Sequence, residues 1–519
     1  MDPPGGDVVL VKVTRKPPEV VKAVQPLPPS PGCGTMPRSA QSVEAAHGKV
    51  AAVVPCHNYG RFLGQCLKSL EAQTRPFDEV LIVDDNSSDD TPDIADAFVA
   101  RHRNWRYLRV KLGMGPLSRN AGVAETQADF IVHVDADNWL YARFVETLIP
   151  AFTDHRVGLA YGRLRMVGED GAPSFASGFA RPFDHDSLRR ANYIDTCAIS
   201  RRQCHEDAGG WKPHQYLDDW IFALDITRAG WDCRYVDETV AAYRQHPTQT
   251  TRTHDYTESR QRAMREAFEV AVVTPFAGRT WALKRYFEAL DKLDWPRERL
   301  RVVAIDNSGD AKFGRELRKR LSGVRASSVA YVDLPTEHAM GLSAAELAAN
   351  TQVRTSVADA TSVPLAALWQ RAGAYLGTAD VVLTWEDDVV PPDGALTKLF
   401  EGLGENVGVV AGIVRMRYGD KEPLLQRFTS LSPVRREILP QPGPDEIAPV
   451  DFTGFGFSLI RRQLWREIRF RVRPDWAVYT HDPWYDVAFA KDAKILGWDW
   501  MAHGGVVVRH YQEGGREYV

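Results

Sequence analysis

The stretch Phe130-Ile-Val-His-Val-Asp-Ala-Asp-Asn-Trp139 runs from apolar residues directly into two acids, Asp135 and Asp137. Such an apolar run is typical of a buried strand in a parallel sheet, and open α/β sheets bind their ligands at the carboxyl ends of their strands. Two carboxylates at that position offer the oxygen ligands that Mg²⁺ or Mn²⁺ prefers. The pattern also occurs by chance as a solvated strand end, so the rest of the chain must decide between these interpretations.

The residues before this stretch alternate between strand and helix patterns. An apolar strand at residues 51–54 ends at Pro55, and the next one, at residues 80–83, ends in Asp84 and Asp85. Residues 62–70 carry apolar side chains at helical spacing, and a second helix is predicted over residues 91–103. Strands that alternate with helices predict an α/β fold with a mostly parallel central sheet flanked by helices.

The pattern then begins a second time. Residues 270–275 match residues 51–55, and residues 302–308 match residues 81–87. Ala379–Asp388 aligns without a gap on Ala128–Asp137, although about thirty extra residues precede it, around residues 322–362. A repeat of this length predicts two domains of one fold. We expect a proline-rich disordered leader at 1–47, one domain at 48–257, a linker at 258–269 and a second domain at 270–519.

The composition limits the classes of partner. The 519 residues are 44% hydrophobic and have a formal net charge of −4, so no basic field indicates a nucleic-acid partner, although residues 101–111 are locally basic. The six cysteines form no Cys-x-x-Cys pair, which fits a reducing compartment. No apolar run of about 18 residues predicts a membrane span, and the amino terminus has no signal-peptide pattern. We therefore expect a cytoplasmic protein.

Taken together, the motifs of residues 48–255 resemble those of family 2 glycosyltransferases of the GT-A fold. Val54-Pro-Cys-His-Asn58 resembles the family's first strand and Val83-Asp-Asp-Asn-Ser-Ser-Asp89 its V-D-D-x-S-x-D loop, while Ser118-Arg-Asn-Ala-Gly122 resembles its A-R-N-x-G motif. Asp135 and Asp137 then occupy its D-x-D motif. The resemblance implies Mn²⁺ or Mg²⁺ at Asp137 and a nucleotide-sugar donor, expected to be UDP-linked. The residues that it assigns to this donor are Pro55, His57, Asn58, Asp84, Asp85, Arg119 and Asp135.

Two further motifs complete this resemblance. Gly209-Gly-Trp211 and Leu217-Asp-Asp-Trp220 resemble the family's glycine and acidic motifs, although Asp218 stands where Glu is commoner. By this resemblance Asp219 is the catalytic base, eleven residues before Gly230. Tyr243-Arg-Gln-His246 resembles the closing motif, whose histidine completes the metal site. The acceptor is expected near Trp211, Asp218 and Trp220.

The chemistry of sugar transfer fits these residue types. A divalent cation stabilises the leaving diphosphate, and a carboxylate within hydrogen-bond reach makes the acceptor hydroxyl nucleophilic. One base without a second carboxylate nucleophile suits a single displacement with inversion. Since the chain contains many acids, the expectation of inversion rests on the resemblance.

The second copy is more divergent. Donor contacts are expected at Pro275, Asp306, Arg371 and Glu386, metal ligands at Asp388 and His510, and an acceptor contact at Trp484. Its base is ambiguous: Asp486 lies eleven residues before Gly497, as Asp219 does before Gly230, whereas Asp482 lies 28 residues before His510, close to the 27 between Asp219 and His246. His481-Asp482 stands where the acidic pair of the motif is expected, and this slightly favours Asp482 as the base.

Each assignment has a simpler alternative. Asp84 and Asp85 suit an Asx-turn, His246 an ordinary surface histidine, and Arg119 an ion pair with a helix carboxylate. Trp211 and Trp220 suit a core, and Glu386–Asp388 suits a relic that only packs or caps.

Four functions remain open at this point. The first is a glycosyltransferase with two active sites, and the second has one active N-terminal site and a non-catalytic acceptor-binding or scaffold domain. A nucleotidyltransferase is disfavoured because residues 55–60 form no glycine-rich triphosphate loop, and a sugar-binding module leaves Asp219 without a role. The acceptor hydroxyl is left open between a glycan, a protein side chain and a modified nucleobase, as is homo-oligomer formation.

Overall fold

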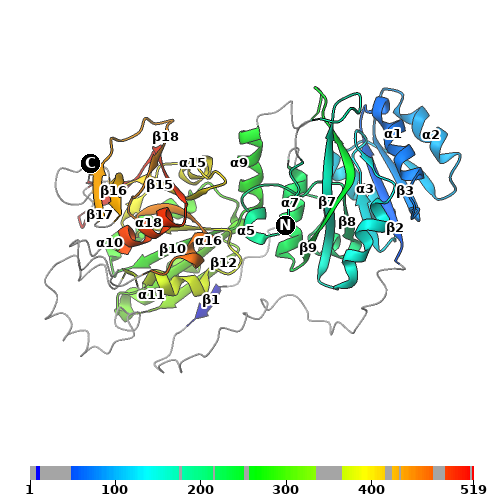
Figure 1. Cartoon of the computed structure of the whole chain (residues 1–519). Coiled ribbons are helices and arrows are strands. Elements are labelled where there is room, and N and C mark those ends of the chain that lie inside the picture. The colour runs from blue at the N-terminus through cyan, green and yellow to red at the C-terminus, as the bar shows by residue number, and fades with distance from the viewer. Residues whose placement is uncertain are drawn as a thin grey trace. The chain divides into compact units, whose positions relative to one another are not determined.

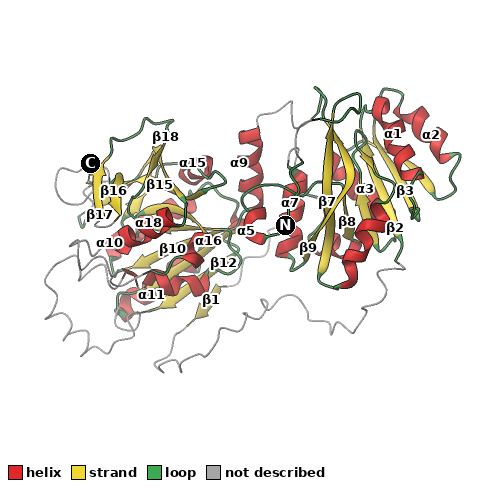
Figure 2. Ribbon diagram, in the orientation of Figure 1, coloured by secondary structure: helices red, strands yellow, loops and turns green. Residues whose placement is uncertain are grey.

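The computed structural model describes residues 8–11, 48–174, 178–213, 217–249, 256–334, 365–366, 368–414, 424–431, 434–470, 485–514 and 517–518. The chain divides into two compact units (Figure 1). The N-terminal unit is Gln25–Ala263, and the C-terminal unit is Met264–Val519 together with Met1–Val24. Each unit has one large sheet with flanking helices (Figure 2), which confirms the predicted α/β fold class.

The N-terminal unit is built on an eight-stranded sheet of order β4-β3-β2-β5-β8-β7-β9-β6. Neighbours among its first four strands run parallel, and β8 runs antiparallel to both β5 and β7. In chain order the strands are β2 Val50–Cys56, β3 Glu79–Asp85, β4 Trp105–Val110, β5 Phe130–His133, β6 Trp139–Leu140, β7 Val157–Val167, β8 Ala198–Arg201 and β9 Asp232–Arg244. The helical segments are α1 Gly60–Glu71, α2 Thr91–Val99, α3 Gly115–Ala124, α4 Phe144–Leu148, η2 Ile149–Thr153, α5 His185–Leu188, α6 Arg202–Asp207 and α7 Asp218–Arg228.

Strand β2 shows why its sequence is apolar throughout. Ala52 and Val54 pack into a core with α1 and α2, whereas Ala51 and Val53 face a second core that includes Val123 of α3. Because successive strand residues point to opposite faces, a strand covered on both sides needs an apolar residue at every position. The carboxyl end of β2 is thereby fixed between those of β3 and β5.

The C-terminal unit has a nine-stranded sheet of order β1-β12-β11-β10-β13-β19-β15-β20-β18 and two small sheets, β14-β21-β22 and β16-β17. The strands are β1 Val8–Val11, β10 Val270–Phe276, β11 Leu300–Asp306, β12 Ser328–Asp333, β13 Val381–Trp385, β14 Val389–Val390, β15 Val407–Ile413, β16 Gln426–Leu431, β17 Val434–Ile438, β18 Ile447–Val450, β19 Phe457–Arg461, β20 Asp499–Val507, β21 Arg509–Tyr511 and β22 Glu517–Tyr518. The helical segments are α10 Thr280–Asp291, η3 Arg297–Arg299, α11 Ala311–Leu321, η4 Gly373–Tyr375, α15 Ala395–Glu401, α16 Arg462–Glu467 and α18 Tyr485–Ile495.

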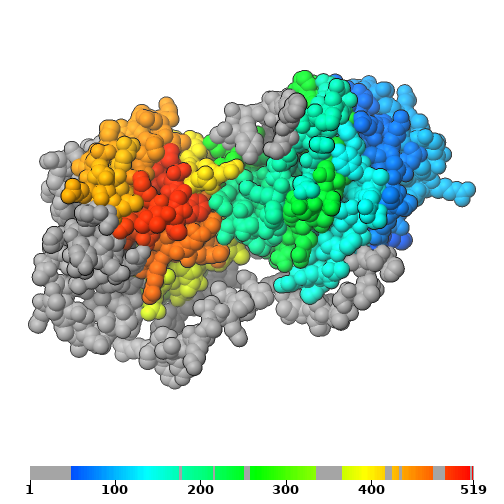
Figure 3. Space-filling model, in the orientation of Figure 1, coloured from blue at the N-terminus to red at the C-terminus, as the bar shows by residue number. Residues whose placement is uncertain are grey.

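Seven strands of the two sheets follow the same order. The series β12-β11-β10-β13-β19-β15-β20 repeats β4-β3-β2-β5-β8-β7-β9, with the antiparallel strand β19 in the place of β8. In both units the last pair of this series, β15–β20 or β7–β9, is parallel. On the face seen in Figure 3, red residues from near the end of the chain lie against orange residues of the same unit. The internal repeat seen in the sequence therefore extends to strand order and direction.

The predicted linker and the predicted leader both contain regular secondary structure. Helix α9 Tyr256–Ala267 spans the boundary after Ala263, where the sequence suggested a linker. Within the predicted leader, Val8–Val11 forms β1 and pairs in parallel with β12 of the C-terminal unit. Among the described residues, no helix combines the length and the apolarity that crossing a membrane requires.

Candidate nucleotide-sugar and metal sites

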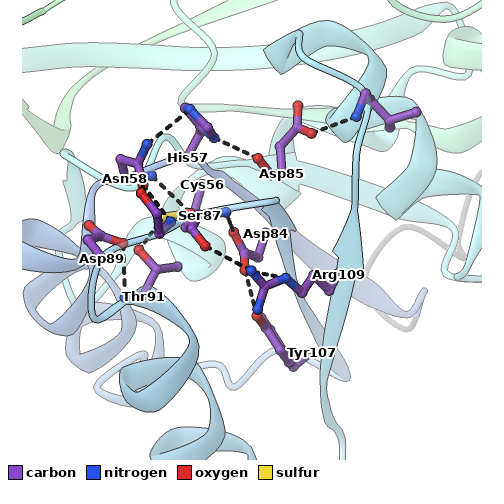
Figure 4. Close-up of polar contacts among 12 residues, drawn as sticks. Cys56, His57, Asn58, Asp84, Asp85, Ser87, Asp89, Thr91, Tyr107 and Arg109 are labelled. Carbon is purple, nitrogen blue, oxygen red and sulfur yellow. Dashed lines mark hydrogen bonds and ion pairs between the residues drawn. The ribbon is translucent and has the colours of Figure 1, made fainter.

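The carboxyl ends of β2 and β3 are joined by a polar network in the N-terminal unit (Figure 4). His57 Nδ1 lies 2.6 Å from the backbone oxygen of Asp85, and the backbone N–H of Asn58 donates to Ser87 Oγ at 2.9 Å. Asn58 Oδ1 in turn accepts from the Ser88 backbone N–H at 2.8 Å. Asn58 adopts a left-handed conformation with φ of 57°, which asparagine tolerates better than most residues. The first-strand motif and the acidic loop thus form one rigid edge.

Asp84 and Asp85 have different surroundings. Asp84 is fully buried; it accepts from the Ser87 backbone N–H at 2.8 Å and from the Tyr107 hydroxyl at 2.6 Å (Figure 4). A carboxylate with no exposed surface cannot reach a nucleotide, so Asp84 has the turn-forming role that was the simpler alternative, and we correct its donor-contact assignment.

Asp85 is the last residue of the same strand and is buried, with 6% of its surface exposed. It accepts from the backbone N–H groups of Leu112 and Met114, at 2.6 and 3.1 Å, and from Ser118 Oγ at 3.3 Å. Burial acts to raise its pKa, but these hydrogen bonds outweigh that effect and hold the pKa of Asp85 below its ordinary value. Asp85 is therefore an ionised group that fixes the loop leading into α3.

Arg119 of α3 connects two acids that are far apart in the sequence. One guanidinium nitrogen pairs with Asp218 at the start of α7, and Nη2 donates to Asp135 Oδ1 at 2.6 Å. The guanidinium also lies 4.7 Å from the centre of the Trp211 ring. Asp135 Oδ2 accepts from Thr196 Oγ1 at 3.0 Å, a contact that no sequence motif indicated. Arg119 thus forms the ion pair considered as its alternative role, and it holds the first acid of the D-x-D motif in place.

The second acid of this motif meets the predicted histidine. His246 Nε2 lies 3.0 Å from Asp137 Oδ2, and His246 is buried, with 1% of its surface exposed, rather than on the surface. Thr248 Oγ1 lies 3.1 Å from Nδ1, where it can accept a hydrogen bond from Nδ1–H and so leave the Nε2 lone pair for a cation. Burial raises the pKa of Asp137. An imidazole nitrogen beside a buried carboxylate oxygen is a donor set that fits Mn²⁺ or Mg²⁺.

Asp219 stands at the start of α7 in strongly acidic surroundings. Its Oδ1 accepts from the backbone N–H of Trp220 at 2.8 Å. Burial raises its pKa to about 8, and the charges of Asp218 and Asp195 add to this effect, while a hydrogen bond from Asn192 opposes it. Burial also raises the pKa of Asp195 to about 6. Neither Asp195 nor Asn192 belongs to a motif that the sequence revealed.

The two tryptophans assigned to the acceptor lie in the core. Trp211 is 3% exposed, stacks on Phe222 at 4.2 Å between ring centres, and donates from Nε1 to His133 at 3.1 Å. Trp220 is 1% exposed and donates to the backbone oxygen of Leu188 at 2.6 Å. Because neither ring has an exposed face for stacking on a sugar, we correct their assignment as acceptor contacts. Both are core residues that pack beneath the site.

In the C-terminal unit a three-ligand group forms after β13. Among the described residues, Glu386, Asp388 and His510 can place one ligand atom each within 4.8 Å of one another. His510 Nε2 lies 3.4 Å from Asp388 Oδ2, because the β14–β21 ladder sets His510 opposite Val389. Two carboxylates and an imidazole fit a divalent cation, as expected for Asp388 and His510.

The residues of this unit that were predicted to contact the donor differ in burial. Pro275 lies in the buried strand β10, and Asp306 is buried with its oxygens accepting from Ser308 and Tyr331. Asp306 is thus excluded from donor contact for the same reason as Asp84. Arg371 is exposed. The arginine that reaches the acids is Arg279, which pairs with Asp387 and Asp388.

Of the two candidate bases of the C-terminal unit, Asp486 lies in the part of the chain that the structure describes. Asp482 and Trp484 lie outside the described residues. Asp486 is the second residue of α18, as Asp219 is of α7, and its Oδ1 accepts from the backbone N–H of Val487 at 2.9 Å. This matches the bond from Trp220 to Asp219 and gives Asp486 the equivalent position in the fold.

Comparisons with known proteins agree with the N-terminal geometry. Residues 51–207 match the family model described as glycosyl transferase family 2. Glycosyltransferase GlyA of Streptococcus pneumoniae is 27% identical over 121 residues, which are 23% of this chain and 17% of that protein. Hyaluronan synthase of Streptococcus pyogenes is 37% identical over 123 residues, 22% of this chain and 29% of that protein. The chain thus matches well under two thirds of the length of these relatives.

Two solved structures resemble parts of this chain. S. aureus TarS 1–349 in complex with UDP-GlcNAc has a TM-score of 0.36 at 16% identity, covering 63% of this chain and 83% of that one. The mannosyltransferase PcManGT from Pyrobaculum calidifontis, in complex with GDP-Man and Mn²⁺, has a TM-score of 0.32 at 22% identity, covering 42% of this chain and 61% of that one. From the family match, residues 51–207 form a family 2 glycosyltransferase domain.

Proposed function

We propose that this protein transfers a sugar from a nucleotide-sugar to an acceptor hydroxyl with the help of a divalent cation. The observation that carries the proposal is the contact between His246 and Asp137 at 3.0 Å, in which Asp137 belongs to residues 51–207, the range that matches glycosyl transferase family 2. The half-buried Asp219, whose pKa is raised, and the anchored Arg119 complete the set of groups that such a transfer needs.

Each group has a role in the proposed reaction. Asp137 and His246 would hold Mn²⁺ or Mg²⁺, which supplies positive charge to the leaving diphosphate. Arg119 carries a second positive charge to the same edge of the sheet. Asp219 takes the proton of the acceptor hydroxyl while the acceptor oxygen bonds to the anomeric carbon. At the same time the bond from that carbon to the phosphate oxygen breaks, and the nucleoside diphosphate leaves. A single displacement of this kind inverts the anomeric centre.

The raised pKa of Asp219 fits the role of a base with one condition. A carboxylate with a pKa of about 8 is a far stronger base than an ordinary aspartate, but at neutral pH it is largely protonated. The base form must therefore be favoured by positive charge brought by the donor complex or by higher pH. Asp218, paired with Arg119, contributes to this raised pKa and is better described as a supporting residue than as an acceptor contact.

We further propose that the C-terminal unit is a second transfer site. Its support is the preformed group of Glu386, Asp388 and His510, and the equivalence of Asp486 to Asp219 makes Asp486 its proposed base. A scaffold domain would not need three ligand atoms within 4.8 Å at the carboxyl end of the strand equivalent to β5. A unit that only binds acceptor or only packs remains the competing proposal, and loss of Asp388 separates the two.

The donor and acceptor are proposed by class. We propose a UDP-linked sugar as donor and a glycan as acceptor, with a protein side chain or a modified nucleobase as the alternatives. The experiment incubates the full-length protein with a panel of UDP-, GDP-, ADP- and TDP-sugars and Mn²⁺, and measures nucleotide release with and without candidate glycans. Release that requires Mn²⁺ and is lost in Asp137→Ala or Asp388→Ala supports the proposal. Full release in metal-free buffer rejects it.

A further inference from the structure

Arg279 of the C-terminal unit ends the stretch Thr274–Arg279, which stands where the N-terminal unit has its first-strand motif, but no role was predicted for this arginine from the sequence. It ends the loop between β10 and α10 and directly precedes the first residue of α10. One guanidinium nitrogen pairs closely with Asp387, and Nε lies 3.6 Å from Asp388 Oδ2. About 29% of the side-chain surface is exposed, so the pairing with the acids leaves part of the Arg279 side chain open to solvent.

The two acids hold Arg279 in different ways. The Asp387 side chain is fully buried, and burial raises its pKa to about 7 although Arg279 opposes the shift. Asp387 is not part of the three-ligand group, so its pairing with Arg279 does not compete with a metal ion. Asp388 is shared, since Arg279 approaches it from one side and His510 from the other at 3.4 Å. Asp387 is thus an anchor, and Arg279 is held beside the metal position.

The N-terminal unit contains the same arrangement built from another element. There Arg119 of α3 is anchored by Asp218 and reaches Asp135, the first acid of the D-x-D motif. In the C-terminal unit Arg371, the residue expected to match Arg119, is exposed, and the cation beside the acids comes instead from the β10–α10 loop. Both units therefore set one anchored guanidinium against the acids at the end of their central strands.

We propose that Arg279 is a donor-binding residue of the C-terminal unit, whose guanidinium binds the diphosphate of the nucleotide-sugar beside the divalent cation. This inference rests on the proposed function of that unit. The planar fork of arginine matches phosphate oxygens, and the N-terminus of α10 adds positive potential at the same point. At 3.6 Å the contact with Asp388 is longer than a hydrogen bond, so that edge of the guanidinium is available to phosphate while Asp387 keeps the other edge in place.

The test uses the full-length protein in an Asp137→Ala background, which leaves the C-terminal centre as the intact metal site. Arg279→Gln removes the charge, and Arg279→Lys keeps the charge without the fork. Arg285→Gln, on the same helix but over the ring of Tyr511 at 4.9 Å, is the matched control. Two quantities are measured separately: Mn²⁺ affinity without nucleotide, by electron paramagnetic resonance, and UDP affinity at saturating Mn²⁺, by calorimetry.

UDP affinity and Mn²⁺ affinity should respond differently to the loss of Arg279. In Arg279→Gln we expect UDP affinity to fall about 10- to 100-fold, the usual range for a charge-assisted hydrogen bond. Mn²⁺ affinity should stay equal or tighten, because a positive charge has been removed from beside the acids. Arg279→Lys should lie between wild type and Arg279→Gln in UDP affinity, and Arg285→Gln should match the background.

Three outcomes would overturn the inference. UDP affinity of Arg279→Gln within threefold of the control would show that Arg279 does not touch the diphosphate. A joint fall in Mn²⁺ and UDP affinity would make Arg279 only a structural partner of the acids. If the Asp137→Ala background binds neither Mn²⁺ nor UDP, and Asp388→Ala changes nothing further, the proposed function of the C-terminal unit itself has failed.

Discussion

The hydroxyl of Tyr331 donates a hydrogen bond of 2.7 Å to Asp306, and Tyr107 makes the equivalent bond of 2.6 Å to Asp84 in the N-terminal unit. The ladders agree, because Asp306 pairs with Asp333 of β12, as Asp84 pairs with Arg109 of β4. Asp306 therefore takes the place of Asp84, and the position of Asp85 is taken by Asn307. The two units keep the buried acid that supports the loop and differ at the residue that follows it, which is Asp85 in one unit and Asn307 in the other.

Removing either tyrosine hydroxyl should destabilise the unit that contains it. Tyr331→Phe leaves a buried Asp306 oxygen without its donor, which typically costs about 1–3 kcal/mol. Tyr107→Phe should do the same to Asp84. Urea unfolding followed by tryptophan fluorescence measures the loss, and Tyr235→Phe, whose hydroxyl meets the largely exposed Asp237, is the control. Equal urea midpoints for Tyr331→Phe and Tyr235→Phe would show that the buried hydrogen bond between Tyr331 and Asp306 does not stabilise the unit.

Asp219→Asn should separate turnover from donor binding. The amide keeps the shape of the side chain but cannot take the acceptor proton, so kcat should fall about 10²- to 10⁴-fold while donor affinity stays close to wild type. The measurement is donor binding by calorimetry beside steady-state transfer. A variant that loses donor affinity and keeps kcat would take Asp219 out of the role of base.

The raised pKa of Asp219 makes a prediction in pH. Because the base must be ionised, transfer by the N-terminal site should fall as pH falls through the pKa, which burial raises to about 8 before donor and metal bind. The effect on stability has the opposite sign: a group whose folded pKa is raised loses stabilisation as pH rises through that value. In EDTA, Asp219→Asn should therefore melt above wild type at pH 9, and this difference should shrink toward pH 5. A difference that grows toward low pH would contradict the buried-acid account.

Gly122 tests how closely α3 must approach the sheet. A Cβ at this position would lie 2.4 Å from Val53 Cγ1, so Gly122→Ala should destabilise the N-terminal unit by about 1–3 kcal/mol. Gly64 of α1 is the matched control, because nothing lies within 4 Å of its Cβ position and alanine favours a helix by roughly 0.5–1 kcal/mol. Chemical unfolding of both variants decides the matter; a neutral Gly122→Ala would show that α3 can shift away.

The sequence predicted those features that depend on local pattern. Apolar runs ending in acids located β3 and β5 because a strand buried on both faces must be apolar and must end where the sheet meets solvent. The same reasoning found the second unit, whose strand order repeats the first. The pairing of Asp137 with His246 followed from the family resemblance rather than from spacing.

Contacts between distant segments were not accessible in this way. Thr196 and Asp195 belong to no repeated motif, and the contact of Arg279 with the acids is likewise made only in the folded chain. The degree of burial was not predicted either: the acidic motif does not indicate that Asp84 is fully buried while Asp85 keeps 6% of its surface exposed. For Trp211 and Trp220, position near a site suggested stacking on a sugar, whereas the stacking of Trp211 on Phe222 and the hydrogen bond from Trp220 to the backbone of Leu188 give them a core role.

The central claim is that the chain holds two metal-assisted transfer sites, and Mn²⁺-dependent transfer by the full-length protein tests it most directly. Wild type, Asp137→Ala, Asp388→Ala and the double variant are compared on one donor and acceptor panel. We predict that the single variants lose different transfers, each retaining the other, and that the double variant loses both. If Asp388→Ala leaves every transfer within a few-fold of wild type, the C-terminal unit is not a transferase and the claim is contradicted.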